Sequence, residues 1–277
     1  MNSSGHDIAV CSWSLHPNGM ADLVSKVQKL GLAHVQLALG ELVMLDDKRK
    51  HEELGHLRAS NIQLTGGMMG FLGEDYSTIA RIRETGGFVP DTDWPLRKRL
   101  AVEGARLANE IGIGSVTSHV GFVPPPGSNG YVEIVARIRE LAGAFADHGV
   151  DLLMETGQEP AAELLHFLHD LKSPNVHINF DPANMILYGA GDPIEAIGIL
   201  GPHIRHVHVK DATPSNQPGT IWGEEVPFGT GNVDPSRFLC ALGRAGYSGP
   251  LAIEREAGID RMRDVATAIS ALKNVAV

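Results

Sequence analysis

Five side chains that can bind a metal ion or carry a proton recur between residues 119 and 254. They are His119, Glu155, Asp181, His208 and Glu254. Each stands at or near the end of a short, mainly apolar segment that is typical of a strand. Three carboxylates and one imidazole would form a hard donor set, which suits Mn²⁺ or Mg²⁺ best and also admits Co²⁺ or Zn²⁺. Such a cation polarises a substrate carbonyl and stabilises an enediolate.

Taken singly, each of these residues also has an ordinary structural interpretation. A glutamate at the end of a strand often caps a helix or forms a surface ion pair, and Asp181 before Pro182 fits a turn. His119 could be a packed histidine. In residues 205–211, Val207 and Val209 alternate with polar side chains, so this strand either faces solvent or lines a site. Convergence on one rim favours a site, because neighbouring carboxylates repel one another unless a cation lies between them.

Eight strand-like segments alternate with eight amphipathic helical segments, and this alternation predicts one α/β domain, a single (β/α)8 TIM barrel spanning residues 1–277. The expected strands are residues 8–13, 34–39, 62–65, 114–119, 150–155, 176–181, 204–210 and 250–254. The expected helices are residues 20–30, 46–59, 95–111, 131–148, 160–171, 192–200, 234–243 and 259–274. In a barrel, the polar strand ends would meet at the C-terminal mouth, with Glu155 and Glu254 flanking a substrate. The long connections 68–94 and 211–233 would lie over that mouth.

Composition excludes several classes of protein. The 277 residues are 43% hydrophobic and 20% charged, which is enough apolar material for a folded core. Twenty-three basic against 33 acidic residues give a net charge of -10, which argues against nucleic acid as a partner. Cys11 and Cys240 form no CxxC pair, so we expect neither a disulfide framework nor a zinc knuckle. We find no signal peptide and no apolar run long enough for a membrane span, and we expect a cytoplasmic protein.

Five motifs in the second half carry a resemblance to a known family. They read M-E-T-G at 154–157, F-D-P-A-N at 180–184, H-V-H-V-K-D at 206–211, G-T-G-N-V-D at 229–234 and G-Y-S-G-P-L-A-I-E at 246–254. In content and spacing they resemble the xylose isomerase-like TIM barrel superfamily, which includes the sugar phosphate isomerase/epimerase family. By resemblance to its ketose 3-epimerases, Glu155, Asp181, His208 and Glu254 would bind one divalent metal, Mn²⁺ being favoured. The two glutamates would also act as catalytic acid and base.

The resemblance also suggests substrate contacts, and it has two departures. His119, Asn184, Lys210 and Trp13 would contact substrate, and His206 would support the site from below. Those epimerases carry a substrate-binding histidine where this chain has Asn184, and an arginine where it has Pro214. Substrate hydroxyls would therefore be held differently. Residues 85–94, T-G-G-F-V-P-D-T-D-W, would form a lid that excludes water.

The expected function is a metal-dependent isomerase or epimerase that abstracts a proton next to a carbonyl of a sugar or polyol. Its partner would be a small carbohydrate, and it could form a homo-oligomer. The alternative is a lyase of the inosose dehydratase type, in which the same intermediate expels a hydroxyl group. An endonuclease IV-like hydrolase fits less well, because that branch needs more histidines and binds DNA. A non-catalytic barrel subunit is a further alternative.

Overall fold

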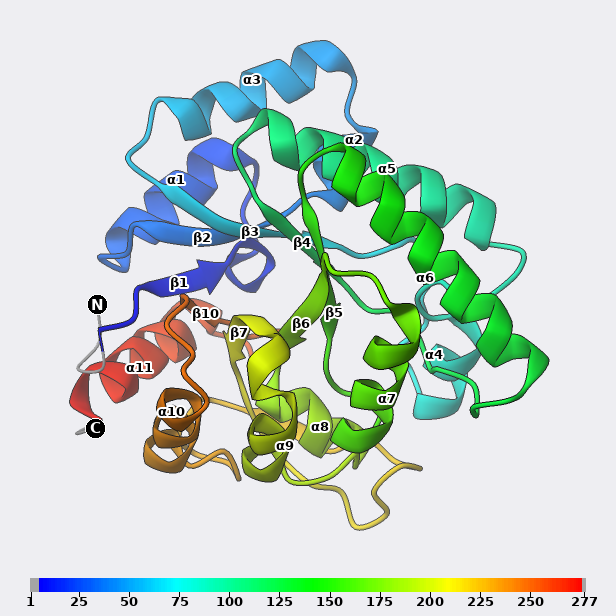
Figure 1. Cartoon of the computed structure of the whole chain (residues 1–277). Coiled ribbons are helices and arrows are strands. Elements are labelled where there is room, and N and C mark those ends of the chain that lie inside the picture. Colours follow the sequence, from blue (N-terminus) through cyan, green and yellow to red (C-terminus); the bar gives the residue numbers. More distant parts are fainter. Residues whose placement is uncertain (1–4, 276–277) are drawn as a thin grey trace.

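The computed structural model describes residues 5–275, and its centre is a closed barrel of eight parallel strands (Figure 1). Around the barrel the strands follow the order β1-β10-β7-β6-β5-β4-β3-β2. Their bounds are β1 Ile8–Cys11, β2 His34–Ala38, β3 Gln63–Met69, β4 Ser115–Ser118, β5 Asp151–Glu155, β6 Val176–Phe180, β7 Ile204–Val209 and β10 Leu251–Ile253. Because β1 pairs with both β2 and β10, the sheet closes on itself, and the prediction of a (β/α)8 barrel is confirmed.

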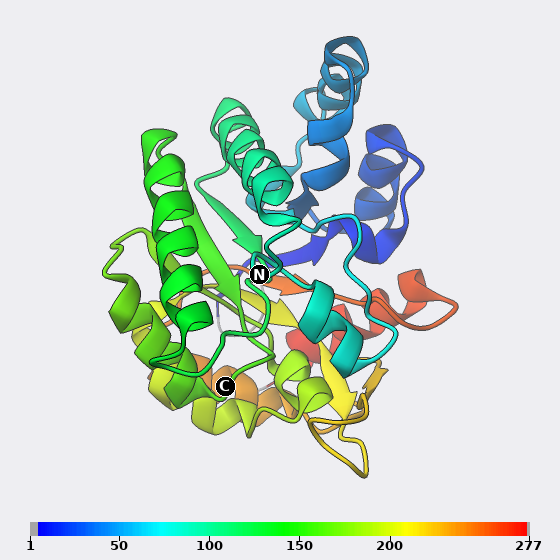
Figure 2. The same cartoon turned by 90° about the vertical axis from the view of Figure 1, so that its right-hand side faces the viewer.

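Eight helices surround the strands, one for each predicted helical segment, and Figure 2 shows several of them ranged around the barrel. They are α1 Met20–Lys29, α3 Asp47–Arg58, α5 Trp94–Glu110, α6 Asn129–Asp147, α7 Ala161–Leu171, α9 Pro193–Leu200, α10 Pro235–Arg244 and α11 Arg261–Asn274. Several begin at a side-chain cap that accepts a hydrogen bond from a backbone N–H of the first turn. The capping residues are Asp46, Ser128, Asp192, Asp234 and Asp260.

Several short elements that the sequence analysis did not predict lie in the connections. They are the helices α2 Gly40–Met44, α4 Ile79–Thr85 and α8 Pro182–Tyr188, the 3-10 turns Ser12–Leu15 and Gly201–His203, and an antiparallel hairpin of β8 Asp211–Thr213 with β9 Glu224–Val226. Most are too short for a periodic pattern to be recognised in the sequence. All but the second 3-10 turn follow a barrel strand, so they build the rim of the C-terminal mouth.

The third strand is longer than predicted. It continues through Gly66 and Gly67 to Met69 instead of ending at residue 65. A Cβ atom on Gly67 would lie 2.5 Å from Cδ1 of Leu39, so a glycine is needed here for close packing. The two glycines therefore mark a crowded strand and not the end of one.

Residues 85–94 are a packed connection, and the expectation of a movable lid over the mouth is not met. The side chain of Phe88 is fully buried, and its backbone N–H donates to the carbonyl of Val120 at 2.8 Å. The guanidinium groups of Arg97 and Arg137 each donate to two backbone carbonyls of this segment, at 2.6 to 2.9 Å. Buried charge-assisted hydrogen bonds of this kind hold a connection in one conformation.

Inside the barrel, polar side chains replace part of the usual apolar filling. Small residues of β1 and β10, Ala9, Cys11 and Ala252, form a separate buried cluster. Four other strands, β2, β4, β6 and β7, bury polar side chains, namely Gln36, Thr117, Asn179, His206 and His208. Buried polar groups need hydrogen-bond partners, so this interior predicts an ordered network below the mouth. Within residues 5–275, we find no helix long and apolar enough to cross a membrane.

Candidate metal centre and active site

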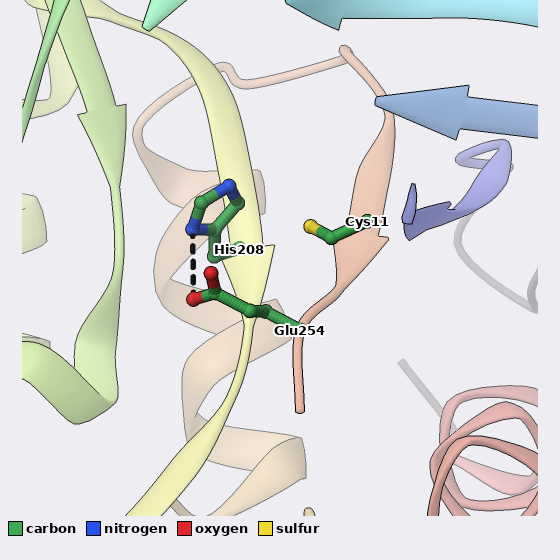
Figure 3. A group of neighbouring side chains, drawn as sticks. All are labelled: Cys11, His208 and Glu254. Atoms are coloured by element: carbon green, nitrogen blue, oxygen red, sulfur yellow. Dashed lines mark ion pairs between the residues drawn. The ribbon is translucent and has the colours of Figure 1, made fainter. Parts of the chain in front are cut away.

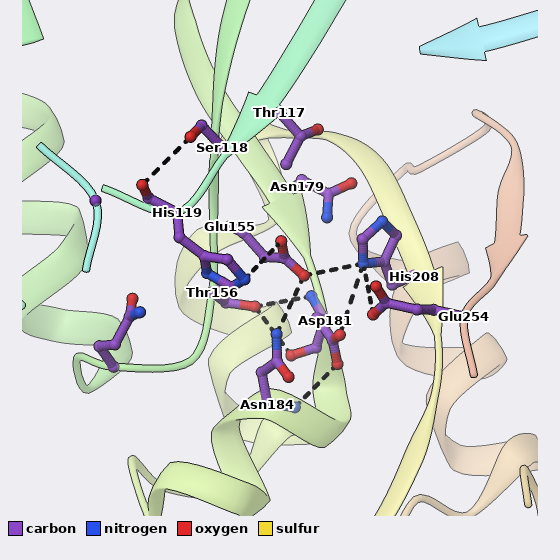
Figure 4. A network of polar contacts seen from close by, with 12 residues as sticks. Thr117, Ser118, His119, Glu155, Thr156, Asn179, Asp181, Asn184, His208 and Glu254 are labelled. Carbon is purple, nitrogen blue, oxygen red and sulfur yellow. Dashed lines mark hydrogen bonds and ion pairs between the residues drawn. The ribbon is translucent and has the colours of Figure 1, made fainter. Parts of the chain in front are cut away.

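Four of the predicted residues lie together at the C-terminal mouth of the barrel (Figure 4). Glu155, Asp181, His208 and Glu254 come from the ends of β5, β6, β7 and β10, all are buried, and their candidate ligand atoms lie within 4.8 Å of one another. His208 Nδ1 is 3.0 Å from Glu155 Oε1 and 3.2 Å from Glu254 Oε2. Its distance to Asp181 Oδ2 is 3.6 Å. We call these four residues the carboxylate–histidine cluster.

The conformation of Asp181 follows from the start of helix α8. Its Oδ1 accepts the backbone N–H of Asn184 at 2.9 Å, and Pro182 takes up the first helical position. The Thr156 hydroxyl donates to the Asp181 carbonyl at 2.9 Å and accepts the Asp181 N–H at 2.8 Å. The backbone and one carboxylate oxygen are thus held, which leaves Oδ2 directed at the cluster.

Two buried carboxylate oxygens of the cluster lack a hydrogen-bond partner among the described residues. These atoms are Glu155 Oε2 and Asp181 Oδ2. Three buried carboxylates lie close together here, and they raise the pKa values of the two buried cationic groups that they contact, His208 and Lys210. A divalent cation would offset this charge and give both oxygens a partner. The donor set, three carboxylates and one imidazole nitrogen, fits a hard cation.

Gln36 in β2 orients the metal-facing histidine, and the sequence analysis missed it. Its amide nitrogen donates to Thr117 Oγ1 at 3.2 Å and, more weakly, to the Gly67 carbonyl at 3.5 Å. Its amide oxygen therefore faces His208 Nε2, at 2.6 Å. With Nε2 as the donor to Gln36, Nδ1 is the ring nitrogen that faces the carboxylates. Burial would lower the pKa of His208, but these carboxylates outweigh it and raise that pKa. A single glutamine among the apolar residues of a buried strand was the available signal.

Cys11 lies beside the His208–Glu254 pair, as Figure 3 shows. Its thiol donates to the amide oxygen of Gln36 over 3.4 Å. Burial raises the pKa of this thiol to about 12, so it stays protonated at neutral pH. Cys11 therefore packs beside the cluster as a neutral group.

His206 occupies the layer below the cluster and does not face the carboxylates. Its Nδ1 lies 2.8 Å from Asn179 Oδ1, and its Nε2 lies 3.1 Å from Thr65 Oγ1. Burial lowers the pKa of His206 to about 3, with the neighbouring His208 adding to the effect. A neutral, doubly hydrogen-bonded imidazole at this depth supports the floor of the site.

Trp13 and Lys210, both predicted to contact substrate, hold Glu254 in place. Trp13 Nε1 donates to Glu254 Oε1 at 2.7 Å, and Lys210 Nζ donates to Glu254 Oε2 at 2.9 Å. Lys210 also donates to Glu256 Oε2 at 2.7 Å and to Asn184 Oδ1 at 3.4 Å. Burial alone would lower the pKa of Lys210, but the surrounding carboxylates outweigh it and raise that pKa. The ammonium therefore stays charged.

His119 and Asn184 contact the other glutamate. His119 Nε2 lies 3.3 Å from Glu155 Oε2, and Asn184 Nδ2 donates to Glu155 Oε1 at 3.1 Å. Burial on its own would raise the pKa of Glu155, but the imidazoles of His119 and His208 outweigh burial and lower it. Likewise, burial would raise the pKa of Glu254, and Lys210 with His208 lowers it. Both glutamates are therefore ionised at neutral pH.

A cavity of about 870 Å³ opens above the cluster, and Trp13, His119, Asn184, Lys210 and Glu254 all line it. The two long connections that were predicted to lie over the mouth meet at its rim. Trp222 Nε1, in residues 211–233, donates to the carbonyl of Tyr76, in residues 68–94, at 3.1 Å. The rings of Trp222 and Tyr188 also pack edge to face, 4.6 Å apart. Residues 85–94 are absent from the cavity lining, so other loop residues cover the site.

Two further acidic residues near the cluster, Asp211 and Glu256, differ in burial and in the groups that they contact. Asp211 is fully buried, and its carboxylate accepts backbone N–H groups from Gly229, Gly231 and Val233 at 2.8 to 2.9 Å. It thereby organises the G-T-G-N-V-D loop and has a structural role. Glu256 keeps about half of its side chain exposed, at 54%, and pairs with Lys210 at the cavity wall.

Comparison with known proteins identifies the relatives of this fold. The family model described as xylose isomerase-like TIM barrel matches residues 24–275. The crystal structure of a xylose isomerase domain protein from Planctomyces limnophilus superposes with a TM-score of 0.87 at 35% identity, covering 96% of this chain and 95% of that one. An L-ribulose 3-epimerase from Methylomonas sp. (strain DH-1) is 27% identical over 171 residues, 57% of this chain and 54% of the epimerase.

A third relative performs a different reaction. A 3-dehydroshikimate dehydratase from Bacillus anthracis is 32% identical over 88 residues, 30% of this chain and 31% of the dehydratase. The chain thus spans about half the length of the epimerase and about a third of the dehydratase. The family match covers most of the chain, and the barrel geometry agrees with it. The chain belongs to the xylose isomerase-like TIM barrel family.

Proposed function

We propose that this protein is a metal-dependent isomerase or epimerase of a sugar or related polyol. The carrying observation is the buried carboxylate–histidine cluster at the floor of a large cavity, with two ionised glutamates on different strands. The epimerase relative supports this choice of chemistry. Glu155, Asp181, His208 and Glu254 would hold one divalent cation, with Mn²⁺ favoured and Mg²⁺, Co²⁺ or Zn²⁺ as alternatives. Bound there, the cation would supply a Lewis acid that polarises the substrate carbonyl.

In this proposal the two glutamates move the proton. One carboxylate removes the proton from the carbon next to the carbonyl. The other takes up a proton from solvent and returns it on the opposite side, and the first carboxyl group then releases its proton to solvent. The lowered pKa values of Glu155 and Glu254 keep both available as bases at neutral pH. Trp13 and Lys210 hold the Glu254 carboxylate, and Asn184 holds that of Glu155. Substrate hydroxyls would exchange partners with Lys210 and Asn184, and His119 lines the cavity beside them.

The test is a pair of charge-removing substitutions, Glu155→Gln and Glu254→Gln. The Mn²⁺-loaded protein is incubated with a panel of ketoses in D₂O, and NMR follows both product formation and deuterium entering the substrate. We expect each variant to lose at least about 100-fold in rate, because general acid–base catalysis contributes roughly 10²- to 10⁴-fold. Glu163→Gln, an exposed change on α7, is the control. Full activity in either active-site variant on a turned-over ketose would show that the acid–base assignment is wrong.

A lyase is the second candidate, because the dehydratase relative shows 32% identity over 88 residues. The same proton abstraction can be followed by loss of a hydroxyl group from the neighbouring carbon. The product would then be one water lighter than the substrate and would carry a new ultraviolet-absorbing double bond. Mass spectrometry of the product separates this reaction from epimerisation, which conserves mass.

A further inference from the structure

We propose that the substrate carries an apolar, uncharged substituent beside its reacting sugar or polyol unit. An apolar arm of the active-site cavity would bind that substituent. The arm is defined by Met44, Met68, Phe71, Leu72 and Leu100, which all line the cavity. This inference rests on the proposed function, because it takes the carboxylate–histidine cluster as the place of reaction.

The cavity has two chemically different parts. His119 and Lys210 line it beside the cluster, whereas the five residues of the arm are apolar and have Glu41 and Glu74 as acidic neighbours in the lining. At about 870 Å³, the whole cavity lies near the upper end of the range of roughly 300–1,000 Å³ found for pockets that enclose drug-sized ligands. A single monosaccharide on the floor would leave the arm filled with water against apolar walls, an unfavourable arrangement.

The arm has both a rigid wall and a solvent-exposed edge. Phe71 is 8% exposed and packs edge to face against the fully buried Phe88, with ring centroids 5.2 Å apart. At the edge, Met44 and Leu72 are 55% and 80% exposed. Large apolar side chains that are exposed beside a cavity gain free energy when a ligand removes them from water.

The charges around the cavity oppose an anionic substituent. Among the described residues, Lys210 is the sole lysine or arginine that lines it, and Glu254 and Glu256 already pair with this ammonium. Three more carboxylates line the cavity, those of Glu41, Glu74 and Glu225, and of these Glu225 is paired with Arg255 at 2.7 Å. A phosphate or carboxylate group in the arm would meet these negative charges without a free cation to bind it. The arm therefore fits an aryl or alkyl group and not a sugar phosphate.

The test compares two non-reacting ligands that differ in the substituent alone, methyl β-D-glucopyranoside and phenyl β-D-glucopyranoside. Their dissociation constants for the Mn²⁺-loaded enzyme are measured by isothermal titration calorimetry. We expect the phenyl glucoside to bind about tenfold more tightly or better, as burial of an aromatic ring predicts. Leu72→Asp and Met44→Asp should bring the two constants close together. Their Mn²⁺ affinity, measured in parallel, shows that the barrel remains folded.

Val132→Asp is the matched control, since Val132 is 65% exposed on α6 and lies outside the cavity lining. It should preserve the preference for the phenyl glucoside. Equal or undetectable binding of the two glucosides by the wild-type enzyme would overturn the inference. A second outcome would also overturn it: light scattering shows that the wild type is a dimer and that Leu72→Asp is a monomer, while the ligand preference is unchanged. In that case a second copy of this chain would cover the arm. These readouts need no turnover, so they are independent of the glutamate substitutions that test the proposed reaction.

Discussion

The amide oxygen of Gln36 and Nε2 of His208 lie 2.6 Å apart, although 172 positions separate the two residues in the sequence. The hydrogen bonds of the Gln36 amide nitrogen to Thr117 and Gly67 prevent the amide from turning over. His208 must therefore donate through Nε2, and Nδ1 remains the atom that faces the three carboxylates. One glutamine in β2 thus sets both the tautomer and the ring orientation at the end of β7.

Replacing Gln36 by leucine should weaken metal binding. Without the amide oxygen, His208 Nε2 loses its acceptor, and loss of such a partner typically costs about 10- to 100-fold in metal affinity. Titration calorimetry with Mn²⁺ measures the change. Gln63→Leu, an exposed position in β3, is the control and should match the wild type. Equal Mn²⁺ affinity in Gln36→Leu and the wild type would mean that Gln36 does not orient the ligand.

Replacing Lys210 by methionine should destabilise the metal-free protein. Lys210 and Glu254 are 2% and 4% exposed, and removing one partner of a buried ion pair costs about 3–5 kcal/mol. Urea unfolding measures this loss, and Mn²⁺ should restore part of it by supplying positive charge to the cluster. In the control Lys98→Met, whose ion pair with Glu140 is exposed, we expect a change below about 1 kcal/mol. Equal losses in the two variants would contradict the buried-pair interpretation.

Glu159 should make stability fall with rising pH. Burial raises its pKa from 4.5 to about 7, so the folded state holds this proton more tightly than the unfolded state. The cost of ionising it is absent below pH 4.5, grows between pH 4.5 and 7, and is complete above pH 7. Glu159→Gln removes the charge and keeps the acceptor for the Val123 N–H. Its unfolding free energy should exceed that of the wild type at pH 8, by up to about 3 kcal/mol.

At pH 4.5 the same comparison should show little difference between Glu159→Gln and the wild type, because the glutamate is then protonated in the folded state. Glu52→Gln, an exposed change on α3, should show no pH-dependent difference. Urea unfolding at the two pH values measures all three proteins. A constant difference between Glu159→Gln and the wild type across this range would mean that Glu159 does not titrate with a raised pKa.

Replacing Phe88 by alanine should lower the free energy of unfolding, because residues 85–94 are packed against the barrel. Phe88 is fully buried between Phe71 and Trp94, and truncation of a buried phenylalanine costs about 3–5 kcal/mol. Thermal unfolding measures the loss, with Val132→Ala on the exposed face of α6 as the control. A lid would behave differently: Phe88→Ala would unfold like the wild type and bind substrate more weakly.

The sequence by itself was enough to predict the barrel and to predict that Glu155, Asp181, His208 and Glu254 lie at one rim. Both follow from local patterns, because strand and helix periods are read within a few residues and parallel strands align their ends. Local patterns also mislead. Gly66 and Gly67 resemble a strand end, yet β3 runs through them, because both pair with β2 and Gly67 also pairs with β4. The side chain of Leu39 crowds the position that a Cβ on Gly67 would take.

The tertiary structure decided what surrounds those four residues. Gln36 acts on His208, and Trp13 on Glu254, over 172 and 241 positions, and no local pattern encodes such a contact. Residues 85–94 resemble a glycine-containing lid, but Gly87 has a φ of +61° and its Cβ would lie 2.1 Å from the Val120 backbone. Glycine there permits close packing and not movement. Such contacts arise only when the barrel closes and places distant segments side by side, so they follow from packing and not from sequence period.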